Sequence, residues 1–295
     1  MSTNIVWIRR MRMSDRRSLS VLGEVFASPA GVTGLVLILL MLLAGLIGPL
    51  LTPYSPTTPD VLHTAQAPDS THWLGTDALG RDVLSRTLSG VLVSLRIGVF
   101  SVVISALIGI PLGLISGYYR RVDIFMARFV ELVMVFPGLV LALGLAAILG
   151  GGSESNLIIA LTVSMLPAFI LVTRSEVLRM RNLEFIEAAV TTGASGNRIL
   201  GLHLLPNAMS AILVQLTVNI PAAVLGEAAL SYIGLGVQPP QPSLGTMLAE
   251  AQEQLLRGGW WMAVFPGLAI LCITIGFNLF GDVLRDATDP KFRGA

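Results

Sequence analysis

The stretch GVTGLVLILLMLLAGLIGPLL, residues 31–51, contains no charged side chain and is long enough to cross a lipid bilayer as a helix. A helical span needs about 20 apolar residues to cross roughly 30 Å of hydrocarbon. Lipid cannot satisfy open backbone, and such runs are too uniformly apolar for barrel strands. We therefore predict an all-α, polytopic membrane bundle of six transmembrane helices. The other five apolar runs lie at 93–116, 128–149, 157–173, 208–236 and 260–281.

The composition excludes an ordinary soluble domain. Hydrophobic residues make up 54% of the 295 residues and charged residues 13%, about half of the usual charged fraction. The first apolar run is too long for the core of a signal peptide, and LTPYSP follows it instead of a small-residue cleavage site. We therefore expect this run to be retained as the first span.

Basic residues indicate which side of the membrane each loop faces. With six alternating spans and a cytoplasmic N-terminus, 15 of the 19 Lys and Arg residues lie inside. The outside loops hold only Arg81, Arg86 and Arg257, so the positive-inside rule places both termini in the cytoplasm. The inside residues are Arg9, Arg10, Arg12, Arg16, Arg17, Arg120, Arg121, Arg128, Arg174, Arg179, Arg181, Arg198, Arg285, Lys291 and Arg293.

One polar segment, residues 182–206, separates two apolar runs on the cytoplasmic side. Asn182 is a candidate N-cap, and Gly193 a candidate stop, for a helix whose Phe185, Ile186, Ala188 and Ala189 share one face. Ser195 could cap a second short helix, 197–205, which Pro206 would separate from the fifth span. A pair of short amphipathic helices suits docking to another protein, although an ordinary connecting loop fits the composition equally well.

The segment's sequence resembles the EAA loop of permease subunits of binding-protein-dependent ABC importers. EAAVTTG is followed nine residues later by HLLP. His203 departs from the general pattern, which has Ile there, and is similar to the peptide-importing branch. The resemblance implies that this segment is the coupling helix, which fits a cleft of a cytoplasmic ATPase. The residues that match or mark the motif are Glu187, Ala188, Ala189, Gly193, His203, Leu205 and Pro206.

Further passages resemble the second permease of dipeptide, oligopeptide and nickel importers. They are HWLGTDALGRDVLSR (72–86), IGIPLGLISGYY (108–119), RRVDIFMARFVELVMVFPGLVLAL (120–143) and EAALSYIGLGVQPPQPSLGTML (227–248). The sequence departs from that pattern at Trp73, Leu92 and Glu131. The resemblance implies a type I ABC importer permease fold. From the apolar runs we expect a cytoplasmic tail, 1–30, which shows no such resemblance, and a six-span permease domain, 31–295, with an external loop at 52–92.

The resemblance also implies a transporter subunit with no catalytic site, bound cofactor or metal of its own. Its expected partners are a second homologous permease, two ATPase subunits or domains that bind ATP and magnesium, an extracytoplasmic solute-binding protein and membrane lipid, with no nucleic acid. The sequence agrees, because it contains no GxxxxGK[ST] motif and its only lysine is Lys291. The expected location is the bacterial inner membrane. The external loops, especially 72–90 and 237–259, are the expected contacts of the binding protein or the sister subunit.

Carboxylates within the spans are further candidates. Glu227 and Ser231 lie inside the fifth run, where they could contact a substrate, carry a proton or pack against another helix. At the cytoplasmic end of the third run, Asp123 accompanies Arg128 and Glu131, which are spaced to form an ion pair on one helix face. We interpret this group as interfacial ion pairs.

Two other classes of protein compete with the permease. GASG at 193–196 with His203 is a weak match to an intramembrane serine protease, which needs its Ser and His on separate membrane helices. A proton-coupled secondary transporter is the better alternative, since six spans and Glu227 permit it, but it should show inverted repeats, and none is evident. The same ABC architecture importing nickel or another small solute also fits.

Overall fold

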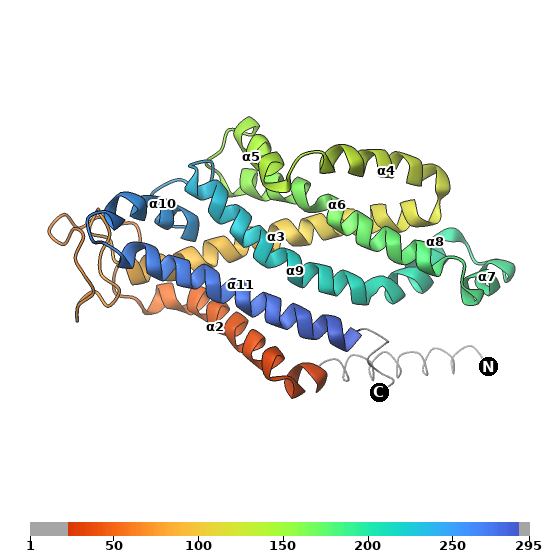
Figure 1. The fold of residues 1–295 in the computed structure, drawn as a ribbon, viewed down its shortest axis with the longest axis horizontal. Coiled ribbons are helices and arrows are strands. Elements are labelled where there is room, and N and C mark those ends of the chain that lie inside the picture. The colour runs from red at the N-terminus through yellow and green to blue at the C-terminus, as the bar shows by residue number, and fades with distance from the viewer. Residues whose placement is uncertain (1–22, 289–295) are drawn as a thin grey trace.

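The computed structural model describes residues 23–288, and this part of the chain is helical, with only two isolated β-bridges and no strand. Five long helices run side by side and form the body of the molecule (Figure 1). They are α2 (Pro29–Leu51), α3 (Val83–Tyr118), α6 (Glu154–Met180), α9 (Leu205–Tyr232) and α11 (Trp261–Thr288). The shorter elements are α4 (Arg120–Met134), α5 (Gly138–Ile148), α7 (Glu184–Thr191), α8 (Gly196–Ile199), a π-helical turn (Leu200–Leu204) and α10 (Leu244–Leu255).

The described residues provide five helices long and apolar enough to span a membrane, and a sixth if α4 and α5 form one span. The third span, expected as one run at 128–149, is instead broken: α4 and α5 meet at 85°. Pro137 lies at the break, as the N-cap of α5. Proline has no N–H to donate and disfavours helical backbone in the residue before it, so the helix ends there.

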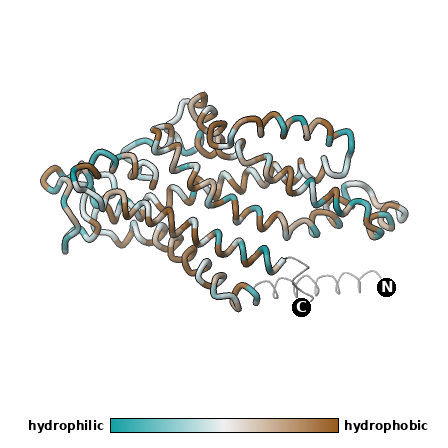
Figure 2. The backbone as a smooth tube through the Cα atoms, in the orientation of Figure 1, coloured by the Kyte–Doolittle hydropathy of each residue, from teal (hydrophilic) through white to brown (hydrophobic). Residues whose placement is uncertain are grey.

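The two ends of the bundle differ. Helix α7 projects at one end, and α10 lies with the segment 52–82 at the other (Figure 1). Between the ends, hydrophobic residues predominate along the long helices (Figure 2). The predictions for residues 1–22 of the tail and for Lys291 and Arg293 concern residues outside the part that the structure describes. We refer below to the α7 end and the α10 end.

Two interhelical ion pairs bracket the apolar part of α6. Arg96 of α3 contacts Glu154 at the start of α6, and Asp123 of α4 contacts Arg174 near its end. Residues 155–173 between them carry no charge. At 1.5 Å per residue this stretch is about 29 Å long, close to the hydrocarbon thickness of a bilayer. These pairs therefore mark the two boundaries of the apolar layer.

The most extensive helix contact is between α3 and α6, which approach each other along Gly109, Gly113 and Gly117. A methyl group added at these positions would lie 2.6 Å from Phe169 Cβ, 2.7 Å from the Ile170 carbonyl oxygen and 2.6 Å from Val177 Cβ. This series of small residues, spaced four apart, therefore allows close packing of the two helices. Hydroxyls add to this contact, because Ser105 Oγ donates to the Thr162 carbonyl at 3.2 Å.

Two connections contain helix. In the segment DALGRDVLSRTLSG, residues 77–90, the residues from Val83 onward are the beginning of α3. Asp82 caps the start of this helix by accepting a hydrogen bond from the Ser85 amide at 2.8 Å. The second external loop, 237–259, contains α10, whose Ser243 and Thr246 form a reciprocal capping box.

The α3–α6 contact generates a prediction for Gly113→Leu. The new side chain would meet the α6 backbone, and overpacking of this kind costs about 1–3 kcal/mol of stability. We expect a lower thermal unfolding midpoint for the detergent-solubilised protein. Gly267→Leu, in α11 where nothing lies within 4 Å of an added methyl group, is the matched control and should leave the midpoint nearly unchanged. An equal loss in both variants would contradict a specific role of the α3–α6 contact.

Candidate functional site

Helix α7 carries the glutamate and alanines of the EAA segment. Different features determine where it begins and where it ends. It begins after Leu183, whose extended backbone is the N-cap, so the prediction of Asn182 as N-cap is wrong by one residue. Glu184 and Glu187 lie in the first turn, where negative charge is favoured by the helix dipole.

The stop at Gly193 is as predicted. Gly193 has φ +81°, its N–H donates to the Val190 carbonyl at 2.9 Å, and the Ala194 N–H donates to the Ala189 carbonyl at 3.0 Å. This hydrogen-bond pattern is the Schellman motif, which favours glycine because other residues avoid positive φ. Nothing lies within 4 Å of an added Cβ, so the backbone angle and not a close contact requires glycine here.

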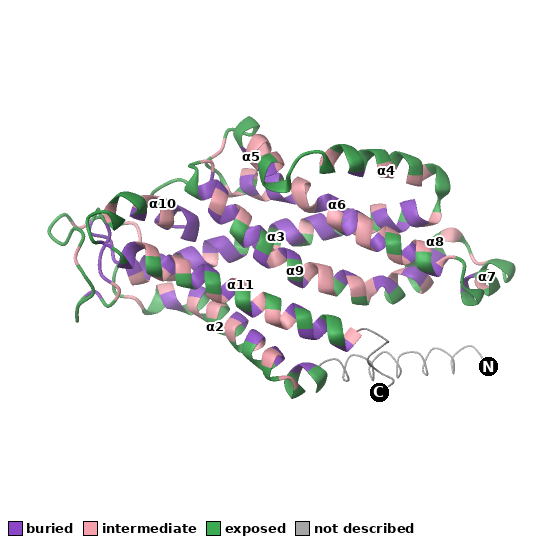
Figure 3. Cartoon of the chain, viewed as in Figure 1, coloured by how far each residue is buried: buried purple, intermediate pink, exposed green. Residues whose placement is uncertain are grey.

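Helix α7 is attached to the bundle through Ile186. This side chain is 2% exposed, and Ala189 packs against the same cluster. Phe185 and Ala188 are exposed on the outer side, so the expected single face of Phe185, Ile186, Ala188 and Ala189 is wrong (Figure 3). Ile186 and Ala189 therefore attach α7 to the bundle, whereas Phe185 and Ala188 lie on its exposed surface. The buried partners of Ile186 in the cluster are Leu114, Val177, Met180, Ile199, Leu200, Leu204, Ala208 and Ile212.

The second short helix does not exist as a separate element. Ser195 occupies the N-cap position of α8 but makes no side-chain capping hydrogen bond, and the helix then continues through the π-helical turn into α9. The Leu205 N–H donates to the Leu200 carbonyl, five residues back. This wider turn accommodates Pro206, which cannot donate, and Asn207 Nδ2 donates to the His203 carbonyl at 2.6 Å. Motion of α8 is therefore passed directly to α9.

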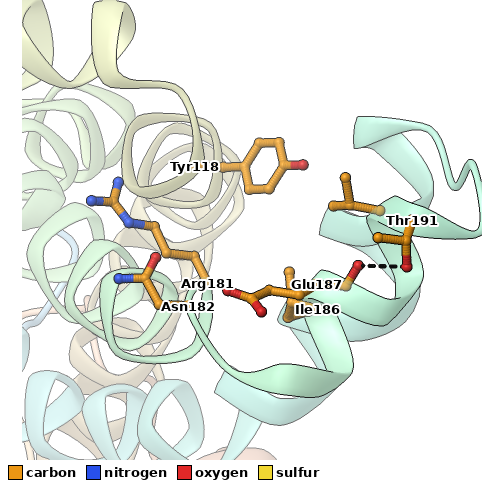
Figure 4. Close-up of a pocket in the computed structure, with 7 residues that line it drawn as sticks. Tyr118, Arg181, Asn182, Ile186, Glu187 and Thr191 are labelled. Carbon is orange, nitrogen blue, oxygen red and sulfur yellow. Dashed lines mark hydrogen bonds between the residues drawn. The ribbon is translucent and has the colours of Figure 1, made fainter.

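A groove of about 400 Å³ separates α7 from the end of α3 (Figure 4). Tyr118 lies on one wall, Glu187 and Thr191 lie on the other, and Arg181 donates to the Gly117 carbonyl at 3.3 Å. Among the described residues, the Glu187 carboxylate has no hydrogen-bond or ion-pair partner, although its backbone carbonyl accepts from the Thr191 hydroxyl. The lining residues are Tyr118, Arg181, Asn182, Ile186, Glu187, Val190 and Thr191.

The α10 end holds an ion cluster that was not predicted from the sequence. One oxygen of Glu250 accepts from both Arg81 and Arg86, each at 2.7 Å, and Arg81 Nε also donates to Asp77 at 2.7 Å. Both arginines are buried. Glu250 is 164 residues from Arg86 along the chain, so only the fold brings them together. The cluster joins α10 to the start of α3 and the loop before it.

Glu227 and Ser231 lie deep in the same half of the bundle. Glu227 is completely buried, and one of its oxygens accepts from the Ser231 hydroxyl at 2.7 Å. The Ser231 oxygen in turn accepts from the Val237 amide at 3.3 Å. This arrangement supports helix packing for Glu227, because the side chain reaches no open surface of the chain.

The charged residues of α4 behave differently from one another. Asp123 pairs with Arg174 of α6, whereas Arg128 pairs with Glu131 on α4 itself at 2.9 Å, at the predicted spacing. The side chains of Arg128 and Glu131 are 81% and 63% exposed. A charge at the centre of a membrane costs about 2.5–3.5 kcal/mol on insertion scales. The free-energy cost of the Arg128 and Glu131 charges therefore depends on what surrounds these two side chains.

The described residues contain no group of three or more His, Cys, Asp or Glu side chains that could hold a metal ion. Cys272, the only cysteine in the sequence, is half-buried in α11.

The Glu250 cluster generates a second prediction. Glu250→Gln would leave two buried arginines sharing one aspartate, and breaking a buried pair costs several kcal/mol, reduced here to about 2 kcal/mol because Glu250 is 31% exposed. We expect a lower thermal unfolding midpoint in detergent. Glu253→Gln, one turn away in an exposed pair with Arg257, is the control and should change the midpoint little. Equal midpoints for the two variants would show that the cluster does not hold α10 in place.

Comparison with known proteins gives matches along most of the chain. Residues 109–294 match the model of the family described as binding-protein-dependent transport system inner membrane component, and residues 22–68 match the N-terminal transmembrane domain of oligopeptide transport permease C. A dipeptide transport system permease protein of Alkalihalophilus pseudofirmus is 39% identical over 89% of this chain and 86% of its own length. A di/tripeptide transport system permease protein of Pseudomonas aeruginosa is 41% identical over 89% of this chain and 88% of its own.

A glutathione transport system permease protein of Pectobacterium atrosepticum is 42% identical over 77% of this chain and 75% of its own. The helical bundle and these matches agree with the resemblance seen in the EAA segment. The protein is thus a polytopic inner-membrane protein and belongs to the family of binding-protein-dependent transport system inner membrane components.

Proposed function

We propose that this chain is the non-catalytic permease subunit of an ATP-driven importer of short peptides, in which it forms half of the translocation path. The observation that carries the proposal is α7: a helix that carries the EAA sequence, projects from one end of the bundle and is seated in it by Ile186. The peptide cargo is inferred from the names of the relatives, among them dipeptide and di/tripeptide permeases.

We assign the α7 end to the cytoplasm. The described part of that end carries arginines at the α3–α4 corner and after α6, and α11 ends on the same side with Arg285 (Figure 1). At the α10 end Arg81 and Arg86 are neutralised by Asp77 and Glu250. This asymmetry follows the positive-inside rule and supports a cytoplasmic location for both termini.

An ATPase partner would bind the outer side of α7. Phe185, Glu187 and Ala188 are exposed there, and a short helix with apolar and small residues suits a groove on another protein. The sequence has no phosphate-binding GxxxxGK[ST] motif, so ATP and magnesium would bind to two ATPase subunits or domains. Glu187, Ala188, Ala189, Gly193, His203, Leu205 and Pro206 would form or support this coupling element.

Coupling would pass through the cluster that holds Ile186. That cluster contains Leu114 of α3, Val177 of α6 and Ala208 of α9, so a displacement of α7 acts on three spans at once. A packed core transmits strain because it has little compressibility. The α10 end, with the segment 52–82 and α10, would contact the solute-binding protein, and a second homologous permease would complete the path.

The first test is co-purification of the tagged chain in mild detergent, followed by reconstitution of the recovered assembly. We expect a second permease and ATPase subunits in near-equal amounts, and peptide uptake into vesicles that requires ATP. Recovery of the chain alone, or uptake that follows a proton gradient without ATP, would support a secondary transporter instead.

A third prediction concerns Gly193. A bulky substitution such as Gly193→Val forces a branched residue into positive φ, which costs about 1–2 kcal/mol, and so frays the end of α7. We expect co-purification with the ATPase and peptide uptake to fall several-fold while membrane insertion stays normal. Gly193→Asn, which tolerates positive φ, should retain most activity, and Gly201→Val is a control without close neighbours. Wild-type uptake by Gly193→Val at normal membrane levels would contradict the coupling role.

A further inference from the structure

Arg128 and Glu131 lie well inside the apolar layer. Val130, between them, belongs to one apolar cluster with Leu166 and Ile170 of α6. Leu166 and Ile170 lie two turns and one turn, respectively, deeper in the apolar layer than Arg174, which marks the boundary at the α7 end. At 1.5 Å per residue, this part of α4 is therefore about 6–12 Å from the boundary.

The two charges lie on the side of α4 that the rest of the chain leaves open. Val130 is the only buried residue of α4, and the other residues of the helix are exposed or half-buried (Figure 3). Hydrophilic residues nevertheless recur along it (Figure 2). With 100° between successive residues, Arg128 is roughly opposite Val130, and Phe125 and Leu132 flank it on the outer face.

Lipid cannot be the neighbour of this outer face. The long side chain of Arg128 can extend towards the boundary, but Glu131 is shorter and lies nearly one turn deeper. Ionised side chains at this depth are costly in hydrocarbon and normally face the interior of a bundle or a water-filled cavity. By contrast, Asp123 is at the boundary and is paired with another helix. The outer face of α4 therefore requires water, a polar ligand or a polar surface of another subunit.

We propose that the outer face of α4 lines the aqueous translocation path, and that Arg128 and Glu131 bind the two charged ends of a zwitterionic short peptide. The proposal rests on the proposed function of peptide import. A guanidinium matches a carboxylate in a bidentate geometry, so Arg128 would take the C-terminal carboxylate, and Glu131 would take the N-terminal ammonium.

Their mutual pair explains how the empty path tolerates both charges. Arg128 and Glu131 satisfy one another at 2.9 Å when no peptide is present. Because the pair is exposed, it is weak, and a passing peptide can replace it without a large penalty. A peptide can pass along the path only if it is released again. An exposed ion pair that exchanges its partners binds the peptide weakly enough for this release.

The first experiment measures what surrounds α4 in the reconstituted transporter complex. Nitroxide labels are attached at Arg128→Cys or Glu131→Cys in a Cys272→Ser background, and their collisions with a water-soluble nickel chelate and with oxygen are compared. Leu107→Cys is the control, because Leu107 is an exposed apolar residue of α3 near the level of Phe169. We expect high nickel access at 128 and 131 and high oxygen access at 107. Labels at 128 and 131 that collide mainly with oxygen, or with neither reagent, would overturn the proposal.

The second experiment separates peptide binding from a structural ion pair. We expect Arg128→Gln and Glu131→Gln to lower the peptide transported per ATP hydrolysed about tenfold, as loss of one charge-assisted hydrogen bond would, while ATPase activity is retained. The charge swap Arg128→Glu with Glu131→Arg keeps the pair, yet should not restore transport, because the charges are reversed. Arg179→Gln breaks an exposed pair of the same spacing outside the apolar layer and should have no effect.

Full transport by the charge swap would show a structural pair and overturn the proposal. An unchanged ratio of transport to ATP hydrolysis in every variant would overturn it as well, while leaving the proposed function intact. If the wild-type complex accumulates no peptide, the proposed cargo is wrong and the assignment of the peptide ends falls with it. The nitroxide measurement would still decide whether α4 faces water.

Discussion

The close approach of α3 and α6 is the constraint on which the other helices depend. Gly109, Gly113 and Gly117 bring the two backbones together in a lipid environment that provides no hydrophobic driving force between helices. Van der Waals contact must then stabilise the pair, and it requires surfaces without protruding side chains. Once α3 and α6 are fixed, α9 packs across both and α4 is left on the outside, where Val130 is its only buried residue and Asp123 pairs with Arg174 of α6.

The two ends of this framework are built for different tasks. At the α7 end the contacts are apolar, and Ile186 seats a short helix on a cluster that includes three spans. At the α10 end an apolar cluster that includes Met247 and Trp261 is accompanied by ion pairs, in which Glu250 holds two buried arginines. An apolar seat allows small shifts of a helix as a unit, whereas buried ion pairs have demanding geometry. The α7 end is thus suited to receiving motion and the α10 end to keeping a fixed shape.

Polar groups inside the apolar layer fall into two classes. Glu227 is enclosed and bonded to Ser231, so it belongs to the packing of α9 against the segment before α10. Arg128 and Glu131 are exposed and, among the described residues, pair only with one another. The Glu227 side chain is enclosed by the chain itself, although its second carboxylate oxygen has no hydrogen-bond partner among the described residues, whereas the surroundings of Arg128 and Glu131 are completed only when water, cargo or another subunit meets α4.

The sequence by itself determined the helical class, the positions of most spans and the stop at Gly193, because length, apolarity and a requirement for positive φ are local properties. The family was also evident from the EAA motif. The tertiary structure alone showed the 85° break between α4 and α5, the merging of α8 with α9 and the Glu250 cluster. Those features depend on contacts between distant residues. The side of α4 that stays uncovered is likewise a result of packing, which no periodicity in the sequence specifies.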